Sequence, residues 1–316
     1  MHNKPFGVEI WMNEFENHCA FNLAETCVES LTIGQLLQMS GKNDTLANDL
    51  AQMKMTYGAI EGSDRLRSNI CTLYDNQAVE NVVVTHGAIG ANALLYETLI
   101  QPGDHIISVL PTYQQHYSIP ESYGAEVEVL QLEPDNAFLP DLDRLATMIR
   151  PNTRLIAVTN PNNPTGALMD RAFLERLANV ARAGNVWVLS DEVYRGTNQS
   201  GDGFAPAIAD VYEKGISLGV VSKSYGLGGV RVGWVACQDR QLIDKLHRYR
   251  QFLSICSGRP DELLATMALQ QHDQIIDDHL SLIRSNLDWL EPRLEPLAEK
   301  LKWLQPQAGC VAFPGL

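Results

Sequence analysis

A lysine and an arginine stand eight residues apart in the stretch VVSKSYGLGGVRVGW, which runs from Val220 to Trp234. Lys223 lies between two serines directly after an apolar run, and three glycines lie between it and Arg231. A lysine amine becomes a nucleophile when burial or nearby cations leave part of it neutral. The planar guanidinium of arginine suits bidentate contact with phosphate or carboxylate. The pair is therefore compatible with a local basic pocket for a small anion.

Polar residues also follow three other apolar runs of the chain. Taken singly, each has an ordinary structural explanation as a turn, a helix cap or a solvated side chain. If all four runs are parallel strands of one sheet, their ends bring together a lysine, a carboxylate, a phenol, an asparagine and free backbone N–H groups. The segments at these ends are His86–Ile89, Asn160–Gly166 (NPNNPTG), Asp191–Arg195 (DEVYR) and Ser222–Lys223.

The elements that must position these groups are short β-branched runs that alternate with amphipathic stretches. This alternation predicts an α/β fold with a mostly parallel seven-stranded sheet sandwiched by helices. Ligands of such sheets bind beyond the carboxyl ends of the strands. Leucines spaced by three and four after residue 256 predict a helix that Pro292 and Pro296 kink or break. The expected strands are NVVVT (81–85), HIISV (105–109), AEVEVLQL (125–132), RLIAVT (154–159), VWVLS (186–190), ISLGVV (216–221) and VRVGWVA (230–236).

The composition argues against several classes of protein. The 316 residues include 24 Lys and Arg against 38 Asp and Glu, and the resulting charge of −14 disfavours nucleic acids and acidic membranes as partners. Six scattered cysteines without metal-ligand spacing predict neither a metal site nor a disulfide framework. No apolar run approaches the ~20 residues of a membrane span, and the first residues lack a signal peptide's apolar stretch. We therefore expect a soluble, cytoplasmic protein with reduced thiols.

The motifs NPNNPTG, DEVY and SKSYGLGGVRVGW together resemble the fold type I pyridoxal-phosphate enzymes of the class I/II aminotransferase family, to which aspartate aminotransferase belongs. The resemblance runs from about Tyr57 to the C-terminus. It implies pyridoxal 5′-phosphate as the cofactor. It also implies a large cofactor-binding domain over residues 56–256, part of a small lobe over residues 1–55, and the start of a C-terminal small domain over residues 257–316.

The resemblance assigns roles to the residues at the ring and aldehyde end of the cofactor. Lys223 matches the lysine that forms a Schiff base with the cofactor aldehyde. Asp191 matches the carboxylate that pairs with the pyridine nitrogen and keeps it protonated, which makes the ring an electron sink. Tyr194 and Asn163 match the partners of the ring hydroxyl oxygen. Tyr113 matches the aromatic side chain that stacks on the ring face.

The remaining matched residues belong to the phosphate end. Arg231 matches the arginine that binds the phosphate, and Ser222 is expected to donate a hydroxyl to the same group. The turn formed by Gly87, Ala88 and Ile89 matches the one whose N–H groups point at the phosphate from a helix N-terminus. Tyr57 matches a tyrosine that reaches the phosphate of the neighbouring subunit, so the resemblance implies a homodimer.

The sequence departs from the family pattern in three places. Val220 stands where many relatives have a serine, so one phosphate contact is missing or supplied otherwise. The stretch NLAETCVESLT replaces a glycine-containing loop near the substrate, with Glu29 and Ser30 as candidates for substrate selection; we favour Ser30 as a helix N-cap. The sequence ends at GCVAFPGL, before any match to the arginine that binds the substrate α-carboxylate. The small lobe is therefore expected to be truncated, and Arg195 or Arg259 are alternative carboxylate ligands.

The expected activity is that of an aminotransferase, which moves an amino group between an amino acid and a 2-oxo acid. Lys223 would act as general base and acid, and the kinetics would be ping-pong. The same apparatus supports elimination or cyclisation, and NLAETCVESLT with PFGVEIW is similar to capreomycidine synthase-like members, which cyclise a modified arginine. Two further alternatives are an inactive truncated homologue and the cofactor-sensing domain of a transcription regulator. The latter is disfavoured because no basic patch precedes Tyr57.

Overall fold

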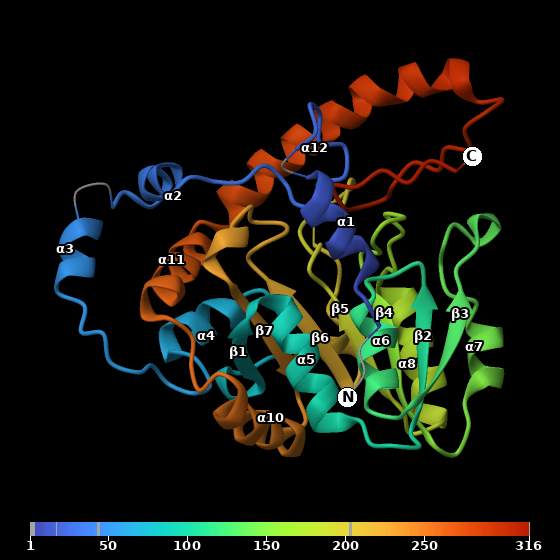
Figure 1. Cartoon of the computed structure of the whole chain (residues 1–316), viewed down its shortest axis with the longest axis horizontal. Helices are drawn as coiled ribbons and strands as arrows, with labels where there is room; N and C mark the ends of the chain where they lie inside the picture. The colour runs from blue at the N-terminus through green and yellow to red at the C-terminus, as the bar shows by residue number, and fades with distance from the viewer. Residues whose placement is uncertain (1–3, 17, 43–44, 202–203, 316) are drawn as a thin grey trace.

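A seven-stranded sheet forms the centre of the computed structural model, which describes residues 4–16, 18–42, 45–201 and 204–315 (Figure 1). The strand order is β1-β7-β6-β5-β4-β2-β3, and β7 runs antiparallel to both of its neighbours. The other six strands are therefore parallel, and their carboxyl ends meet at one edge. The strands are β1 (Val82–His86), β2 (His105–Leu110), β3 (Glu126–Gln131), β4 (Thr153–Thr159), β5 (Trp187–Asp191), β6 (Gly215–Val220) and β7 (Val232–Cys237).

Hydrophobic side chains on both faces of the sheet account for its buried position. Val83 and Ile106 pack on one face, and their neighbours Val84 and Ile107 pack on the other, as the two-residue period of a strand requires. On the first face lie α5 (Gly87–Leu99), α6 (Gln115–Ser122) and α10 (Arg240–Leu253). The second face is covered by α4 (Asp64–Cys71), α7 (Leu142–Met148), α8 (Arg171–Ala183), α9 (Ile208–Val211) and α11 (Arg259–Gln270). The predicted sandwich is confirmed.

The N-terminal segment carries three short helices with little burial of their own. They are α1 (Gly7–Phe15), α2 (Ile33–Ser40) and α3 (Leu46–Ala51). No residue of α1 is buried. The expected N-cap at Ser30 is wrong, because Thr32 caps α2 through a capping box in which its hydroxyl accepts from Gln35 N at 3.2 Å. Glutamine three residues after Thr32 completes the box, and Ser30 lies outside it.

The C-terminal part leaves the sheet along α12 (His272–Leu294) and then returns toward the strand ends (Figure 1). The expected break at Pro292 does not occur, because this proline lies in the last turn and removes a single backbone donor. A 3₁₀ turn, η4 (Glu295–Leu297), contains Pro296 and ends the helical region. Three further 3₁₀ turns of the same length are η1 (Val79–Asn81), η2 (Pro134–Asn136) and η3 (Gly228–Val230).

Two classes of feature are missing from the described part of the chain. None of its helices combines the length and apolar character needed to cross a bilayer. Its His, Cys, Asp and Glu side chains form no group of three or more with metal-binding geometry.

Candidate active site

The first part of the site lies where β1 passes into α5, beside the start of β7. The N–H of Gly87 donates to the carbonyl of Arg231 at 3.0 Å, which joins the two segments. Gly87 has a φ of +65°, and a Cβ added there would lie 2.7 Å from Nη2 of Arg231. A Cβ at Gly233 would lie 2.5 Å from the carbonyl carbon of Gly87. Two glycines therefore let the Arg231 side chain and the first turn of α5 approach closely.

Arg231 itself is held in a specific conformation. Its φ is +55°, which is uncommon for a residue with a side chain, and its Nη1 donates to Gly228 O at 2.8 Å. Ser222 lies nearby in sequence, at the end of β6, and its buried hydroxyl has no hydrogen-bond partner among the described residues. Buried polar groups are normally paired, so an orphaned hydroxyl marks a place for a bound group.

The second part of the site contains a buried carboxylate, Asp191, at the end of β5. Asp191 is only 4% exposed, and its Oδ2 lies 3.1 Å from Nε2 of His116 on α6. Nδ1 of His116 lies 3.0 Å from the hydroxyl of Tyr96 on α5. Burial raises the pKa of the Tyr96 phenol well above its usual range, so its hydroxyl keeps its proton. With its proton on Nε2, His116 donates to Asp191 and its Nδ1 accepts from the Tyr96 hydroxyl. His116 was not predicted, although it lies three residues after Tyr113.

The phenol and the amide from the neighbouring strand ends also meet. Asn163 Nδ2 donates to the hydroxyl of Tyr194 at 3.3 Å, and that hydroxyl donates to the carbonyl of Thr26 at 3.0 Å. Burial raises the pKa of Tyr194 well above its usual range, so the phenol stays protonated. Asn163 follows β4 and Tyr194 follows β5, as expected for the NPNNPTG and DEVYR segments.

Lys223 extends from the end of β6 toward the N-terminal segment. Its Nζ donates to Thr26 Oγ1 at 2.7 Å, lies 3.5 Å from Cys27 Sγ, and is 5.9 Å from the centre of the Tyr194 ring. Thr26 was not predicted. The stretch that contains it was singled out, but Glu29 and Ser30 were named as candidates, and both of these side chains are exposed.

The two remaining predicted tyrosines have different surroundings. Tyr113 follows β2; its hydroxyl donates to Glu9 Oε1 of α1 at 2.6 Å, and its ring centre lies 4.9 Å from that of Phe6. Burial is the largest cause of a strongly raised pKa at Tyr113. Tyr57 lies between α3 and α4 and is 82% exposed. It is therefore available to a neighbouring molecule, and its predicted role across a subunit boundary stays a prediction.

The two arginines considered as substrate-carboxylate ligands are engaged elsewhere. Arg195 donates from Nε to Ala205 O at 2.6 Å and from Nη2 to Leu73 O at 2.8 Å. Nη1 of Arg259 donates to Lys54 O at 2.9 Å and to Thr56 Oγ1 at 3.0 Å. Neither interaction directs a guanidinium toward Lys223.

The C-terminal segment closes over the strand ends from the other side. The N–H groups of Gln307 and Ala308 donate to Gly166 O at 2.9 and 3.0 Å, and Gly309 N donates to Thr197 Oγ1 at 2.8 Å. Cys310 Sγ then donates to the carbonyl of Thr26 at 3.4 Å, and burial raises the pKa of this thiol to about 12. The N-terminal and C-terminal segments therefore meet above Lys223.

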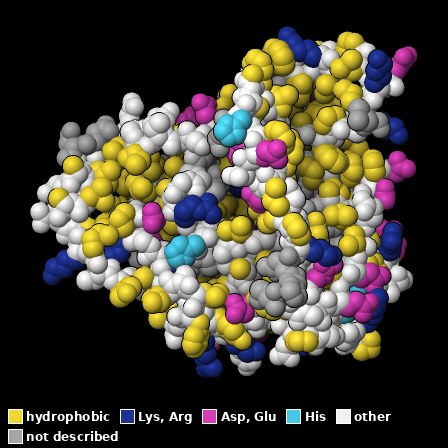
Figure 2. Space-filling model, viewed as in Figure 1, with side chains coloured by type: hydrophobic (Ala, Val, Ile, Leu, Met, Phe, Trp, Pro, Cys, Tyr) yellow, Lys and Arg dark blue, Asp and Glu magenta, His cyan; other side chains and the backbone are white. Residues whose placement is uncertain are grey.

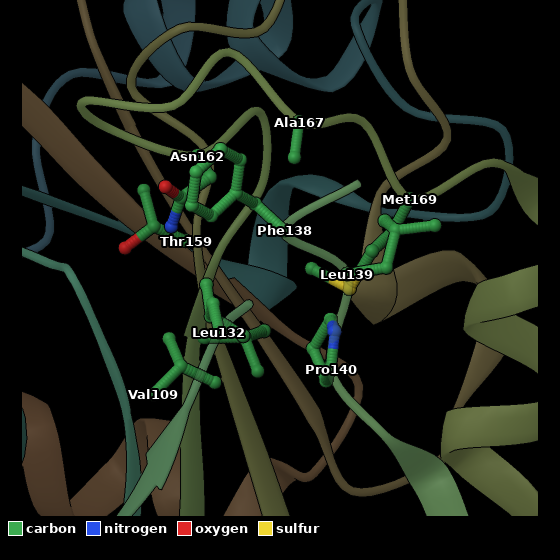
Figure 3. Close-up of a pocket in the computed structure, with 10 residues that line it drawn as sticks. Val109, Leu132, Phe138, Leu139, Pro140, Thr159, Asn162, Ala167 and Met169 are labelled. Carbon is green, nitrogen blue, oxygen red and sulfur yellow. The ribbon is translucent and has the colours of Figure 1, made fainter. Parts of the chain in front are cut away.

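A small apolar pocket lies beside the NPNNPTG loop and is distinct from this group (Figure 3). None of the predicted site residues lines it, although Asn162 of the same loop does. The lining residues are Val109, Leu132, Phe138, Leu139, Pro140, Val158, Thr159, Asn162, Ala167 and Met169.

Comparison with known proteins shows the family to which the chain belongs. The family model for aminotransferase class I and II matches residues 28–316. The chain belongs to this family. Its fold is that of the fold type I enzymes, and its cofactor is pyridoxal 5′-phosphate.

Individual relatives extend the comparison. A PLP-dependent aminotransferase from Streptococcus suis 89-1591 is 41% identical, with a TM-score of 0.91 over 97% of this chain and 81% of that chain. Capreomycidine synthase from Streptomyces vinaceus is 28% identical over 314 residues, which cover 97% of this chain and 78% of the relative. Arginine–pyruvate transaminase from Pseudomonas aeruginosa is 34% identical over 185 residues, 57% of this chain. The matched region spans 47% of that transaminase, about half its length.

The residues present fit the cofactor at both of its ends. Arg231, the first turn of α5 and the orphaned hydroxyl of Ser222 provide positive charge and donors for a phosphate. At the other end, a buried Asp191 offers a carboxylate for a ring nitrogen and Lys223 offers an amine. Val220, the position of the missing serine, is buried and apolar.

Proposed function

We propose that this chain is a pyridoxal-phosphate-dependent aminotransferase that moves an amino group between an amino acid and a 2-oxo acid. The observation that carries the proposal is the meeting of Lys223, the buried Asp191–His116 pair and the Tyr194–Asn163 pair at neighbouring strand ends. When bound, the cofactor supplies an electrophilic carbonyl and an electron sink for a carbanion. Family membership and the 41% identical Streptococcus suis aminotransferase support the assignment.

In this proposal, three groups hold the phosphate and three hold the ring. Arg231, the N–H groups of Gly87–Ile89 and the Ser222 hydroxyl bind the phosphate, because each offers a donor or a positive charge. Asp191 pairs with the ring nitrogen, and His116 Nε2, 3.1 Å from its Oδ2, fixes the position of the carboxylate. Tyr194 and Asn163 would contact the ring oxygen, and the Tyr194 hydroxyl would turn from Thr26 O to donate to it.

Lys223 then acts as the proton carrier. Its Nζ, as a neutral amine, would accept the Cα proton of the bound amino acid and would then donate it to the cofactor carbon that came from the aldehyde, within the same half of the reaction. Tyr194 remains protonated because of its burial, so it cannot compete for that proton. The segments around Thr26 and Cys310 exclude water from this side of the amine.

We include a homodimer in the proposal, with Tyr57 acting on the partner subunit's site. Hydrophobic side chains gather around α2, α3 and α12 on the molecular surface (Figure 2). Tyr57 and Met55 are 82% and 77% exposed, an unusual exposure for two large side chains in one segment. Sedimentation velocity measures the mass directly. A monomer at micromolar concentration contradicts this part of the proposal.

The test of function starts with the cofactor and then screens substrates. Reduction by borohydride should fix the cofactor on Lys223, located by mass spectrometry of peptides, and Lys223→Ala should abolish the label. Amino acids, including arginine because of the arginine–pyruvate relative, are then paired with pyruvate or 2-oxoglutarate. Formation of alanine or glutamate from the added 2-oxo acid supports the proposal. A folded, labelled protein that transfers no amino group from any of the amino acids contradicts it.

A cyclase or lyase is the second candidate, because capreomycidine synthase aligns over 97% of the chain. The two reactions differ in the fate of the amino group. An aminotransferase needs a 2-oxo acid for repeated turnover and transfers nitrogen to it. A cyclase or lyase consumes its amino acid without added 2-oxo acid, so the same assay without the acceptor separates them.

A further inference from the structure

Thr26 connects three side chains of the candidate site. Its hydroxyl accepts a hydrogen bond from Lys223 Nζ at 2.7 Å. Its carbonyl accepts from the Tyr194 hydroxyl at 3.0 Å and from Cys310 Sγ at 3.4 Å. The side-chain oxygen of Thr26 thus binds the lysine, and its backbone oxygen binds the hydroxyl and the thiol that lie near the lysine.

The backbone fixes the position of this hydroxyl. The carboxylate of Glu25 accepts from the N–H groups of Thr26 at 2.7 Å and of Cys27 at 2.9 Å. Further along, Val28 N donates to Lys223 O at 3.4 Å and Leu31 N donates to the carbonyl of Gly226 at 3.0 Å. The segment that carries Thr26 therefore runs beside the segment that carries Lys223, and their relative placement does not depend on the hydroxyl.

We propose that Thr26 is a positioning residue for Lys223. Its hydroxyl receives the Nζ–H of the lysine whenever the amine is free, and so holds the amine beside Tyr194, where the proposed proton transfer takes place. This inference rests on the proposed function. Thr26 would act only through Lys223, and its hydroxyl oxygen would be the one atom responsible.

The other ionisable groups that face Lys223 do not offer an equivalent partner. Burial raises the pKa values of Cys27 and Cys310, and burial likewise keeps Tyr194 protonated, so all three are neutral near pH 7. Glu16 is half-buried, and its pKa is raised by desolvation and by its hydrogen bond to Glu25. Although burial opposes it, backbone donors lower the pKa of Glu25.

A neutral acceptor is suited to a lysine that must exchange protons. A carboxylate in direct contact would hold the ammonium form, whereas a hydroxyl accepts from the ammonium and also from the neutral amine. The interaction still favours the charged form to some extent, because hydrogen bonds that involve a charged donor are stronger than those between neutral groups. Removal of the hydroxyl should therefore make the amine neutral at lower pH.

The first experiment measures Lys223 in the full chain freed of cofactor. Acetylation of Lys223 by trace acetic anhydride is followed against pH by mass spectrometry. In Thr26→Val, the pH midpoint of labelling should fall by about one unit, which is the size expected for the loss of one hydrogen bond to a charged group. Thr26→Ser should keep the wild-type midpoint, and Thr26→Ala should reproduce the valine result if the valine variant fails to fold.

Thr32→Val is the matched control. This change removes a hydroxyl from the same segment and breaks the capping box of α2, but Thr32 does not contact Lys223. It should lower stability and leave the labelling midpoint unchanged. If the midpoint in Thr26→Val equals that of the wild type, or if Thr26→Ser behaves like Thr26→Val, the proposal is wrong.

Turnover adds a second, separate readout. With the cofactor bound, Thr26→Val should lower kcat by about tenfold at unchanged KM and increase the isotope effect of Cα-deuterated substrate, because proton transfer becomes slower. Labelling needs neither cofactor nor substrate, so it decides the role of Thr26 even if no amino group is transferred. If the labelling midpoint shifts as expected but no amino group is transferred, the result counts against the proposed function and not against the role of Thr26.

Discussion

The buried hydrogen bonds that link Tyr96, His116 and Asp191, here called the relay, should contribute measurably to the stability of the fold. His116→Phe keeps an aromatic ring of similar size but removes both ring nitrogens. The Tyr96 hydroxyl and Asp191 Oδ2 then lose partners that lie 3.0 and 3.1 Å from His116 in the wild type. Each unsatisfied buried group costs about 1–3 kcal/mol, so the free energy of unfolding should fall by about 2–6 kcal/mol.

Urea denaturation of the cofactor-free chain, followed by tryptophan fluorescence and circular dichroism, measures this loss. Tyr96→Phe is the control: it leaves only His116 Nδ1 unpaired and should cost about 1–3 kcal/mol. The double variant should cost less than the sum of the two, because the two residues are partners. Cofactor affinity should fall in His116→Phe, since the Asp191 carboxylate loses the partner that lies 3.1 Å from its Oδ2. If both single variants unfold within 0.5 kcal/mol of the wild type, the reasoning about the relay is refuted.

Three further predictions test the packing, the electrostatics and the phosphate end. Gly233→Ala should destabilise the fold by about 1–3 kcal/mol, because the added Cβ would lie 2.5 Å from the backbone of Gly87. Gly228→Ala is the control: its Cβ would meet no atom within 4 Å, so thermal melts should show a wild-type stability for this variant. Burial raises the pKa of Glu192 to about 7 in the folded chain. Between about pH 4.5 and 7 the carboxyl therefore ionises in the unfolded chain but not in the folded one, and the free energy of unfolding should fall by up to about 3 kcal/mol. In urea titrations, the free energy of unfolding of Glu192→Gln should change less over this pH range. Arg231→Ala should weaken cofactor binding by about 10- to 150-fold in a fluorescence titration, and an unchanged affinity would remove Arg231 from the proposed phosphate site.

The sheet and the strand-end residues were predictable because their signals are local. Each strand is a short apolar run, and the parallel arrangement follows from the alternation of strands and helices. The meeting of Asn163 with Tyr194 then follows from the order of β4 and β5. These predictions required only that the carboxyl ends of parallel strands share an edge.

His116 and Thr26 were missed because their partners are remote in sequence. His116 reaches Asp191 across 75 residues, and Thr26 reaches Lys223 across 197. No pattern in a single sequence predicts which hydroxyl of an irregular segment will arrive beside a particular lysine. The incorrect cap at Ser30 has a related origin: several residues of the segment suit a cap, and only the hydrogen bonds of Thr32 and Gln35 decide between them.

The meeting of the two ends above Lys223 has a consequence for synthesis on the ribosome. Every strand of the sheet precedes residue 238, so the sheet can form while later residues are still being added. The contact of Cys310 with Thr26 joins positions 284 residues apart and cannot form until residue 310 has left the exit tunnel. A nascent chain can therefore fold the sheet and pair Lys223 with Thr26 before the C-terminal segment arrives to cover them.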